Sequence, residues 1–100
     1  MIMGMLEPLK VGTDIAITVR LDWSEAVNPG KYFHYFEKDD TATSRTYGVK
    51  LVSFGEGEGL WVQSASDEED ASLIKMLIPW SYIFCVRSWP IDKKGNRVGF

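Results

Sequence analysis

The longest nearly uninterrupted apolar stretch of the chain runs from Leu73 to Trp89, LIKMLIPWSYIFCVRSW, and its only clear break is Pro79. An apolar run without alternation of apolar and polar residues is typical of strands that are covered on both faces. A proline that interrupts such a run favours a sharp corner. The stretch therefore predicts two buried strands, Leu73 to Ile78 and Tyr82 to Arg87, joined by a very short turn at Pro79 to Ser81.

Four further stretches have the pattern of strands. Regular alternation over Asp14 to Trp23 predicts a half-buried strand, and shorter stretches predict strands at Lys31 to Lys38, Tyr47 to Phe54 and Leu60 to Ala65. The three alternate glycines of Gly55 to Gly59 predict a tight turn, a bulge or a sharp bend between the last two. Because nearly every predicted element is a strand, we expect an all-β antiparallel domain, most simply a small closed barrel.

Length and charge narrow the class further. A chain of 100 residues with 45% hydrophobic content has room for one core, so we expect residues 1 to 100 to form a single domain. The net charge of −3 argues against a domain whose main affinity comes from neutralising phosphates. No apolar stretch approaches the roughly 20 residues of a membrane-spanning helix, and Met1 to Leu6 lacks the basic start of a signal peptide. We therefore expect a cytoplasmic protein with no membrane contact.

The sequence contains few residues that could carry out catalysis or bind a metal ion. His34 is the only histidine and lies among aromatic residues, and Cys85 is the only cysteine and is expected to be a buried thiol. One histidine and one cysteine cannot supply the usual ligand set of zinc, and the acidic run Asp67 to Asp70 lacks the spacing of a calcium loop. We expect no enzyme activity, no cofactor and no metal, with the acidic run at a solvated loop tip.

Two stretches carry a family resemblance. Leu51 to Val62, LVSFGEGEGLWV, resembles the first signature of the Sm and LSm proteins, in which an apolar strand bends through a polar loop and resumes. The family usually has aspartate and asparagine where this chain has Gly55 and Gly59. Ile78 to Val86 is similar in its apolar rhythm to the second signature and to the corresponding part of the bacterial Sm-like RNA chaperones.

The second signature departs from the family in its polar residues. Pro79 and Trp80 stand where Sm proteins have arginine and glycine, and the lysine and histidine of the bacterial chaperones fall on Trp80 and Ser81. The apolar framework thus agrees with the family, whereas the residues that hold RNA bases are replaced.

The resemblance implies a strongly bent five-stranded antiparallel barrel of the Sm-like (SH3-like) kind with an additional strand or hairpin. The extra segment is residues 24 to 46 if Asp14 to Trp23 is the first barrel strand; alternatively Lys31 to Lys38 is that strand and the earlier one is extra. Residues 90 to 100 form either a last hairpin or a tail.

In this family the fourth strand of one subunit pairs with the fifth strand of its neighbour, so the resemblance implies a homo-oligomer, a closed ring. The apolar character of the last two strands supports the ring independently, since exposed apolar edges in a monomer would aggregate. The expected interface residues are Leu73, Ile74, Met76, Ile78, Tyr82, Phe84 and Val86.

The resemblance also implies RNA, or another single-stranded polynucleotide, as the ligand of the bend at Gly55 to Gly59. Trp80 could stack on a base there, or serve as a core plug or a subunit contact. The only basic cluster lies near the C-terminus and could attract phosphates, although a solvated terminus explains it equally well. The expected nucleic-acid-binding residues are Gly55, Glu56, Gly59, Trp80, Ser81, Lys93, Lys94 and Arg97. The alternative hypothesis is an SH3-like module that binds protein partners and no nucleic acid.

Overall fold

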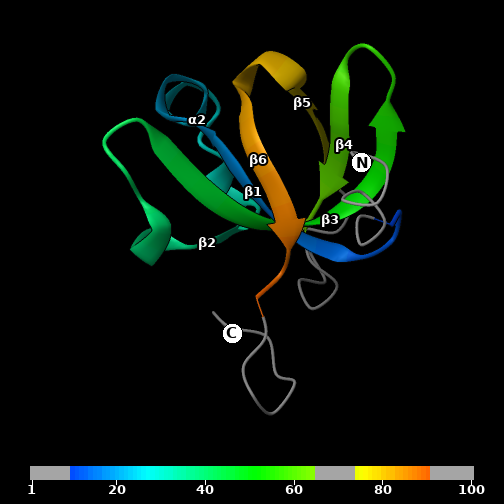
Figure 1. The fold of residues 1–100 in the computed structure, drawn as a ribbon, viewed down its shortest axis with the longest axis horizontal. Helices are drawn as coiled ribbons and strands as arrows, with labels where there is room; N and C mark the ends of the chain where they lie inside the picture. The colour runs from blue at the N-terminus through cyan, green and yellow to red at the C-terminus, as the bar shows by residue number, and fades with distance from the viewer. Residues whose placement is uncertain (1–9, 65–73, 91–100) are drawn as a thin grey trace, which may run out of the picture.

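The computed structural model describes residues 10–64 and 74–90, which form a six-stranded antiparallel sheet and one short α-helix (Figure 1). The prediction of an all-β protein is therefore confirmed. The strands are β1 (Asp14–Arg20), β2 (His34–Tyr35), β3 (Ser44–Gly55), β4 (Gly59–Gln63), β5 (Lys75–Pro79) and β6 (Ile83–Ser88). Their order is β5-β4-β3-β1-β6, with β2 paired to β3 outside this path. The sheet curls strongly, but it is not closed, because β5 and β6 lie at its two ends and are not paired with each other.

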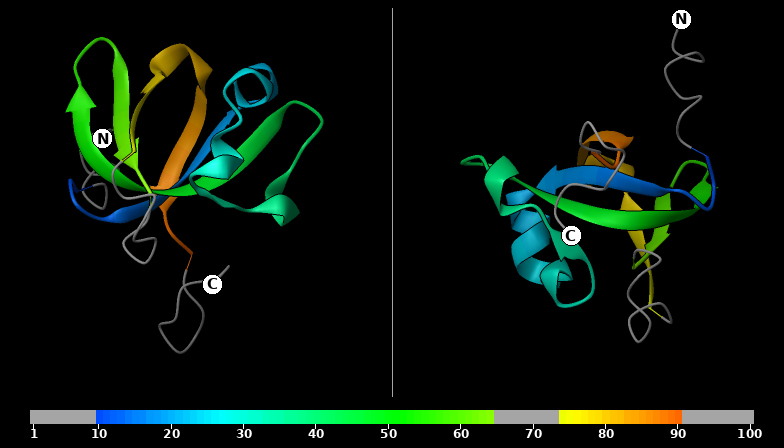
Figure 2. Two further views of the ribbon diagram at one scale, coloured as in Figure 1. Left: turned by 180° about the vertical axis from the view of Figure 1, so that it is seen from behind. Right: turned by 90° about the horizontal axis from the view of Figure 1, so that it is seen from below.

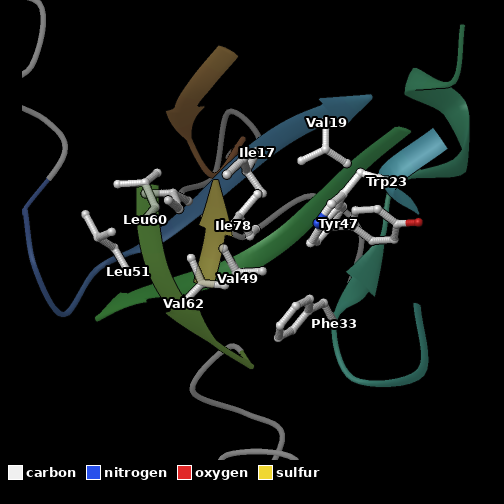
Figure 3. Close-up of a cluster of buried hydrophobic side chains, with 11 residues drawn as sticks. Ile17, Val19, Trp23, Phe33, Tyr47, Val49, Leu51, Leu60, Val62 and Ile78 are labelled. Carbon is white, nitrogen blue, oxygen red and sulfur yellow. The ribbon is translucent and has the colours of Figure 1, made fainter. Parts of the chain in front are cut away.

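The core lies on the inner face of the curled sheet (Figure 3). Alternation along β1 turns Ile15, Ile17 and Val19 inward, each fully buried, as the sequence pattern predicts. The twelve-residue β3 follows the bend of the sheet, and its pairing with β4 shifts register between Leu51 and Ser53. The buried cluster consists of Ile15, Ile17, Val19, Trp23, Phe33, Tyr47, Val49, Leu51, Leu60, Val62 and Ile78.

The segment between β1 and β3 adds to this core. It contains α2 (Leu21–Val27), the 3-10 helices η1 (Pro29–Lys31) and η2 (Glu37–Asp39), and the short β2. From this segment Trp23 and Phe33 enter the buried cluster. β1 lies between β3 and β6 in the sheet, whereas β2 pairs only with β3 outside this order, so the segment between β1 and β3 follows the first long strand and begins at residue 21.

Two strand predictions in this region are confirmed only in part. The strand predicted for Asp14 to Trp23 ends at Arg20, because Leu21 begins α2 and turns Trp23 into the core. The strand predicted for Lys31 to Lys38 is reduced to β2, with a 3-10 helix on either side. Asn28 ends α2 in the left-handed region, with φ 56°, and the helix is therefore only seven residues long.

A second, smaller cluster covers the outer face of the sheet. Ala16, Phe36 and Trp89 are buried there, and His34 lies 5.5 Å from the Trp89 ring centroid. An ideal Cβ added to Gly48 would overlap this ring, with Cζ2 at 2.9 Å and Cη2 and Cζ3 closer still. The glycine therefore lets a tryptophan lie flat on the backbone of β3.

The last two predicted strands are present, but they are not covered on both faces. They are β5 and β6, and the corner between them is the 3-10 helix η4 (Trp80–Tyr82) (Figure 1). Lys75 on β5 and Phe84, Cys85 and Arg87 on β6 are exposed in the single chain, whereas Leu77 is half-buried, and each strand forms an edge of the sheet. The prediction of a buried thiol at Cys85 is therefore wrong. The acidic run Asp67 to Asp70 and the predicted hairpin or tail beyond Pro90 lie outside the described residues.

Candidate assembly edges and the Trp80 corner

The two ends of the sheet are formed by consecutive strands. Among the strands of residues 10–64 and 74–90, β5 pairs only with β4, and β6 pairs only with β1. Each therefore presents one row of backbone groups without a strand partner in this part of the chain. Only the three residues of η4 separate the end of β5 from the start of β6. An unpaired edge at each end of an open sheet is a template for adding another strand.

The predicted interface residues divide into three groups. Ile78 is only 1% exposed and belongs to the core, so its side chain is not available to a partner. Met76, Tyr82 and Val86 are partly buried against the core. Ile74 and Phe84 are 37% and 56% exposed and present apolar surface beside the two edges. Leu73 lies outside the described residues.

Phe84 occupies a β-bulge in the edge strand. The pairing of β1 with β6 joins Thr18 to Cys85 and Val19 to Ile83, so Phe84 has no opposite residue in β1. A bulge of this kind re-aims a side chain and interrupts regular pairing. It accounts for the high exposure of Phe84 in a strand whose neighbours Ile83 and Val86 pack against the core.

A groove of about 410 Å³ opens beside Phe84, and we call it the β6 groove. The end of β1, the first residues of α2 and the loop before β3 form its other walls, at the end of the sheet where Figure 1 shows α2 and the start of β6. Within it Arg20 and Asp22 form an exposed ion pair at 2.7 Å. The Arg20 guanidinium also lies over the Tyr82 ring, 5.3 Å from its centroid. The lining residues are Arg20, Leu21, Asp22, Glu25, Ala42, Thr43 and Phe84.

The corner at Trp80 contacts the hairpin turn between β3 and β4. The turn is tight, as predicted: the Glu58 amide donates to the Gly55 carbonyl at 2.9 Å, and Gly57 has a positive φ of 74°. The Trp80 amide then donates to the Glu58 carbonyl at 3.1 Å. The backbone hydrogen bond from Trp80 to Glu58 thus connects two predicted features, the bend at Gly55 to Gly59 and the corner at Pro79 to Ser81.

The predicted nucleic-acid-binding residues are brought together only in part. Gly59 is buried, and a Cβ there would overlap the Ile78 carbonyl, so it serves the close approach of β4 and β5. Glu56 and Ser81 are exposed, and Trp80 is 43% exposed. The basic cluster of Lys93, Lys94 and Arg97 lies outside the described residues.

Two exposed aromatic residues near this corner were not predicted. Trp61 is 37% exposed on the outer face, 3.6 Å from the position of a Cβ on Gly55, and Phe54 is 44% exposed at the end of β3. Trp61 could have been identified, since it alternates with the buried residues Leu60 and Val62. The residues of the β6 groove gave no such signal, because the groove depends on the segment between β1 and β3, which folds in part as a helix.

The polar groups described here form structural contacts. His34 packs edge-on against Phe36 at 4.8 Å between ring centroids, and within residues 10–64 and 74–90 no three His, Cys, Asp or Glu side chains are close enough to hold a metal ion.

The Tyr35 hydroxyl donates to Asp40, and this bond raises the pKa of Tyr35 to about 12. A second groove, of about 480 Å³, lies beside His34 and is bounded by the bridge from Arg87 to Asp39 at 2.7 Å.

Comparisons of the chain with protein-family models, curated proteins and solved structures gave no match. In the part of the chain that the structure describes, no helix has both the length and the apolar character needed to cross a membrane. The fold and the site together define an all-β protein with an exposed tryptophan corner and, among the described residues, two sheet edges without a strand partner.

Proposed function

We propose that the protein is a non-catalytic, Sm-like β-barrel module that assembles head to tail into a homo-oligomeric ring. One observation carries the proposal: the two strands at opposite ends of the open sheet, β5 and β6, each have an edge with no strand partner within residues 10–64 and 74–90. Pairing β5 of one copy with β6 of the next continues the sheet from subunit to subunit. Contacts of this heterologous kind satisfy every edge only when the chain of subunits closes into a ring.

The apolar surface at the edges supports assembly as well. Ile74 beside β5 and Phe84 in β6 are large apolar side chains that a monomer would leave in water. An exposed apolar edge strand in a monomer is an aggregation site. Ordered pairing between subunits removes that exposure.

The mass of the particle tests the ring. Sedimentation velocity and light scattering at micromolar concentration should give one discrete multimer of the 11.3 kDa chain. A species that stays at the mass of one chain over the whole concentration range would refute the proposal. A broad series of growing particles would also refute it, since an open filament is what unclosed pairing produces.

The ligand of the ring is a separate part of the proposal. The resemblance to Sm proteins implies single-stranded RNA, and the observation in favour is the exposed Trp80 ring at the hairpin corner. Stacking of a base on an aromatic side chain contributes about 1–3 kcal/mol. Fluorescence anisotropy with short U-rich and A-rich strands, at low and at moderate salt, should then show binding that Trp80→Ala weakens and Trp61→Ala leaves unchanged.

A second candidate is an SH3-like module that binds a protein partner. It is favoured by Glu56 and Glu58, which are exposed in the same hairpin turn and form no ion pair among the described residues. Two free carboxylates beside Trp80 repel a phosphate backbone. The absence of RNA binding at low salt would exclude the RNA ligand and leave this candidate, whatever the mass of the particle.

A further inference from the structure

The β6 groove touches the unpaired edge of β6 and has an exposed aromatic side chain, that of Phe84, in its wall. We propose that this groove receives the side chain of Trp80 from the neighbouring copy of the chain. The inference rests on the proposed ring, and it specifies the contact that fixes the register of the two edges. It assigns Trp80 to the subunit contact, which is the alternative to its base-stacking role, and the mass of the Trp80→Ala particle separates the two.

The register follows from matching the two faces of the sheet. All strand pairs of the described sheet are antiparallel, so the added β5 is taken to run antiparallel to β6. Met76 and Val86 both pack against the core, and the register that places them opposite each other keeps the inner face continuous. Leu77 and Cys85 are then opposite each other on the outer face.

The same register brings Trp80 to the groove. Counting along the antiparallel pair from Met76 opposite Val86, with Phe84 as the extra residue of the bulge, Ile78 of the neighbour comes opposite Ile83, and Pro79 lies just beyond the start of β6. Trp80 is the next residue and therefore lies at the end of the edge where the bulged Phe84 forms the groove wall. Both aromatic side chains are exposed in the single chain, at 43% for Trp80 and 56% for Phe84, and they would bury each other.

The groove has the size and the chemistry for one indole ring. Its volume of about 410 Å³ is near the lower end of the range of about 300–1,000 Å³ for small-molecule sites, so it fits one large side chain rather than a segment of chain. The indole N–H needs an acceptor when it is buried. Glu25 can supply one, since its carboxylate forms no ion pair or hydrogen bond with the described residues. Arg20, already over the Tyr82 ring, can lie on the face of the indole.

Trp61 provides a matched control. It is a tryptophan of similar exposure, 37%, but it lies in β4, one strand away from the edge of the sheet. A contact confined to the β5 edge should therefore involve Trp80 and not Trp61. Truncation of a central aromatic anchor typically costs at least 2 kcal/mol, which is about a 30-fold loss of affinity.

The first experiment measures self-association of the full chain by sedimentation equilibrium. Trp80→Ala and Phe84→Ala should each weaken assembly by about 30-fold, while Trp61→Ala should leave it within about threefold of the unmodified protein. Far-UV circular dichroism of each variant checks that the sheet is retained. An association constant that is unchanged in Trp80→Ala would overturn the inference, most directly if that variant instead loses affinity for RNA.

The second experiment uses the exposed native thiol of Cys85 as a reporter of register. Residues directly opposite in an antiparallel pair have Cα atoms about 4.5–5.5 Å apart, which is within the range of a disulfide. Under mild oxidation, Leu77→Cys should therefore give disulfide-linked multimers in a non-reducing gel. The same change combined with Cys85→Ser, and Trp61→Cys alone, should give none.

The outcomes separate the inference from the proposed function. A monomeric unmodified protein would refute the ring and the groove contact together. A ring that tolerates Trp80→Ala, or whose Leu77→Cys variant forms no disulfide-linked multimers, would leave the ring standing and refute the contact.

Discussion

Replacing Gly48 with alanine tests how tightly Trp89 closes the outer face of the sheet. The added Cβ would overlap the far six-membered ring of Trp89, and Trp89 is only 5% exposed and held by Phe36 and Ala16. Overpacking of this kind costs about 1–3 kcal/mol. Alanine returns about 0.5–1 kcal/mol because glycine loses more backbone entropy in a strand. The expected net loss is about 1–2 kcal/mol of the free energy of unfolding.

A double-mutant cycle isolates the clash from the other effects. Trp89→Leu removes the ring atoms that the new Cβ would meet, so in that background Gly48→Ala should no longer destabilise the protein. The expected coupling between the two changes is about 2 kcal/mol. Gly30→Ala is the control, because the nearest atom to its new Cβ is Tyr47 Cε1 at 3.9 Å. It should change the stability by less than about 1 kcal/mol.

Urea denaturation followed by far-UV circular dichroism provides the measurement, since removal of one of the four tryptophans in the Trp89 variant would change the fluorescence signal itself. All variants are compared at one protein concentration, because assembly couples to unfolding. For a domain of this size the loss in Gly48→Ala corresponds to roughly 4–8 °C in Tm for each kcal/mol. A Gly48→Ala penalty of the same size with tryptophan and with leucine at position 89 would refute the packing argument.

Three further changes test other contacts. Tyr47→Phe removes the buried hydrogen bond of 2.5 Å to Ser24 and should destabilise the protein by about 1–3 kcal/mol in urea denaturation, with less added cost in the Ser24→Ala background. Gly57→Ala should cost about 1 kcal/mol because its φ is 74°, and Gly57→Asn should cost less. Tyr35 should titrate at about 12 by ultraviolet absorbance of the tyrosinate, and Asp40→Asn should lower that pKa. Because the folded pKa is raised, the stabilisation by this bond is complete below a pH of about 10 and is lost as the pH rises through about 12.

The sequence identified the strands whose side chains alternate or stay apolar. β1, β3, β4, β5 and β6 all overlap predicted strands, because periodicity reports which faces are buried. The failures lie in residues 21 to 43, where a strand-like pattern from Leu21 onward folds as α2. There Trp23 and Phe33 reach the shared core from a helix and a loop, and tertiary packing overrides the local pattern.

The candidate site was predicted less completely than the fold. The glycine bend and the proline corner could be found because glycine and proline determine local backbone geometry, and their contact through Trp80 and Glu58 follows from the pairing of β4 with β5. The exposure of Cys85 was missed because an edge strand and a central strand can have the same apolar composition. The β6 groove could not be found, since it joins residues from three separate parts of the chain.

The character of the two edges limits the ways in which they can pair. Natural edge strands avoid uncontrolled association through charged side chains and bulges, and here Lys75 on β5, Arg87 on β6 and the bulge at Phe84 have that character. Two β6 edges brought together would place their bulges in the same short pair, and two β5 edges would leave both β6 grooves empty. When β5 of one copy pairs with β6 of the next, the bulge at Phe84 lies near the end of β5, where regular pairing stops and the chain turns at Trp80. The bulge at Phe84 disfavours the pairing of two β6 edges and therefore favours the pairing of β5 from one copy with β6 from the next. The proposed ring needs only this pairing.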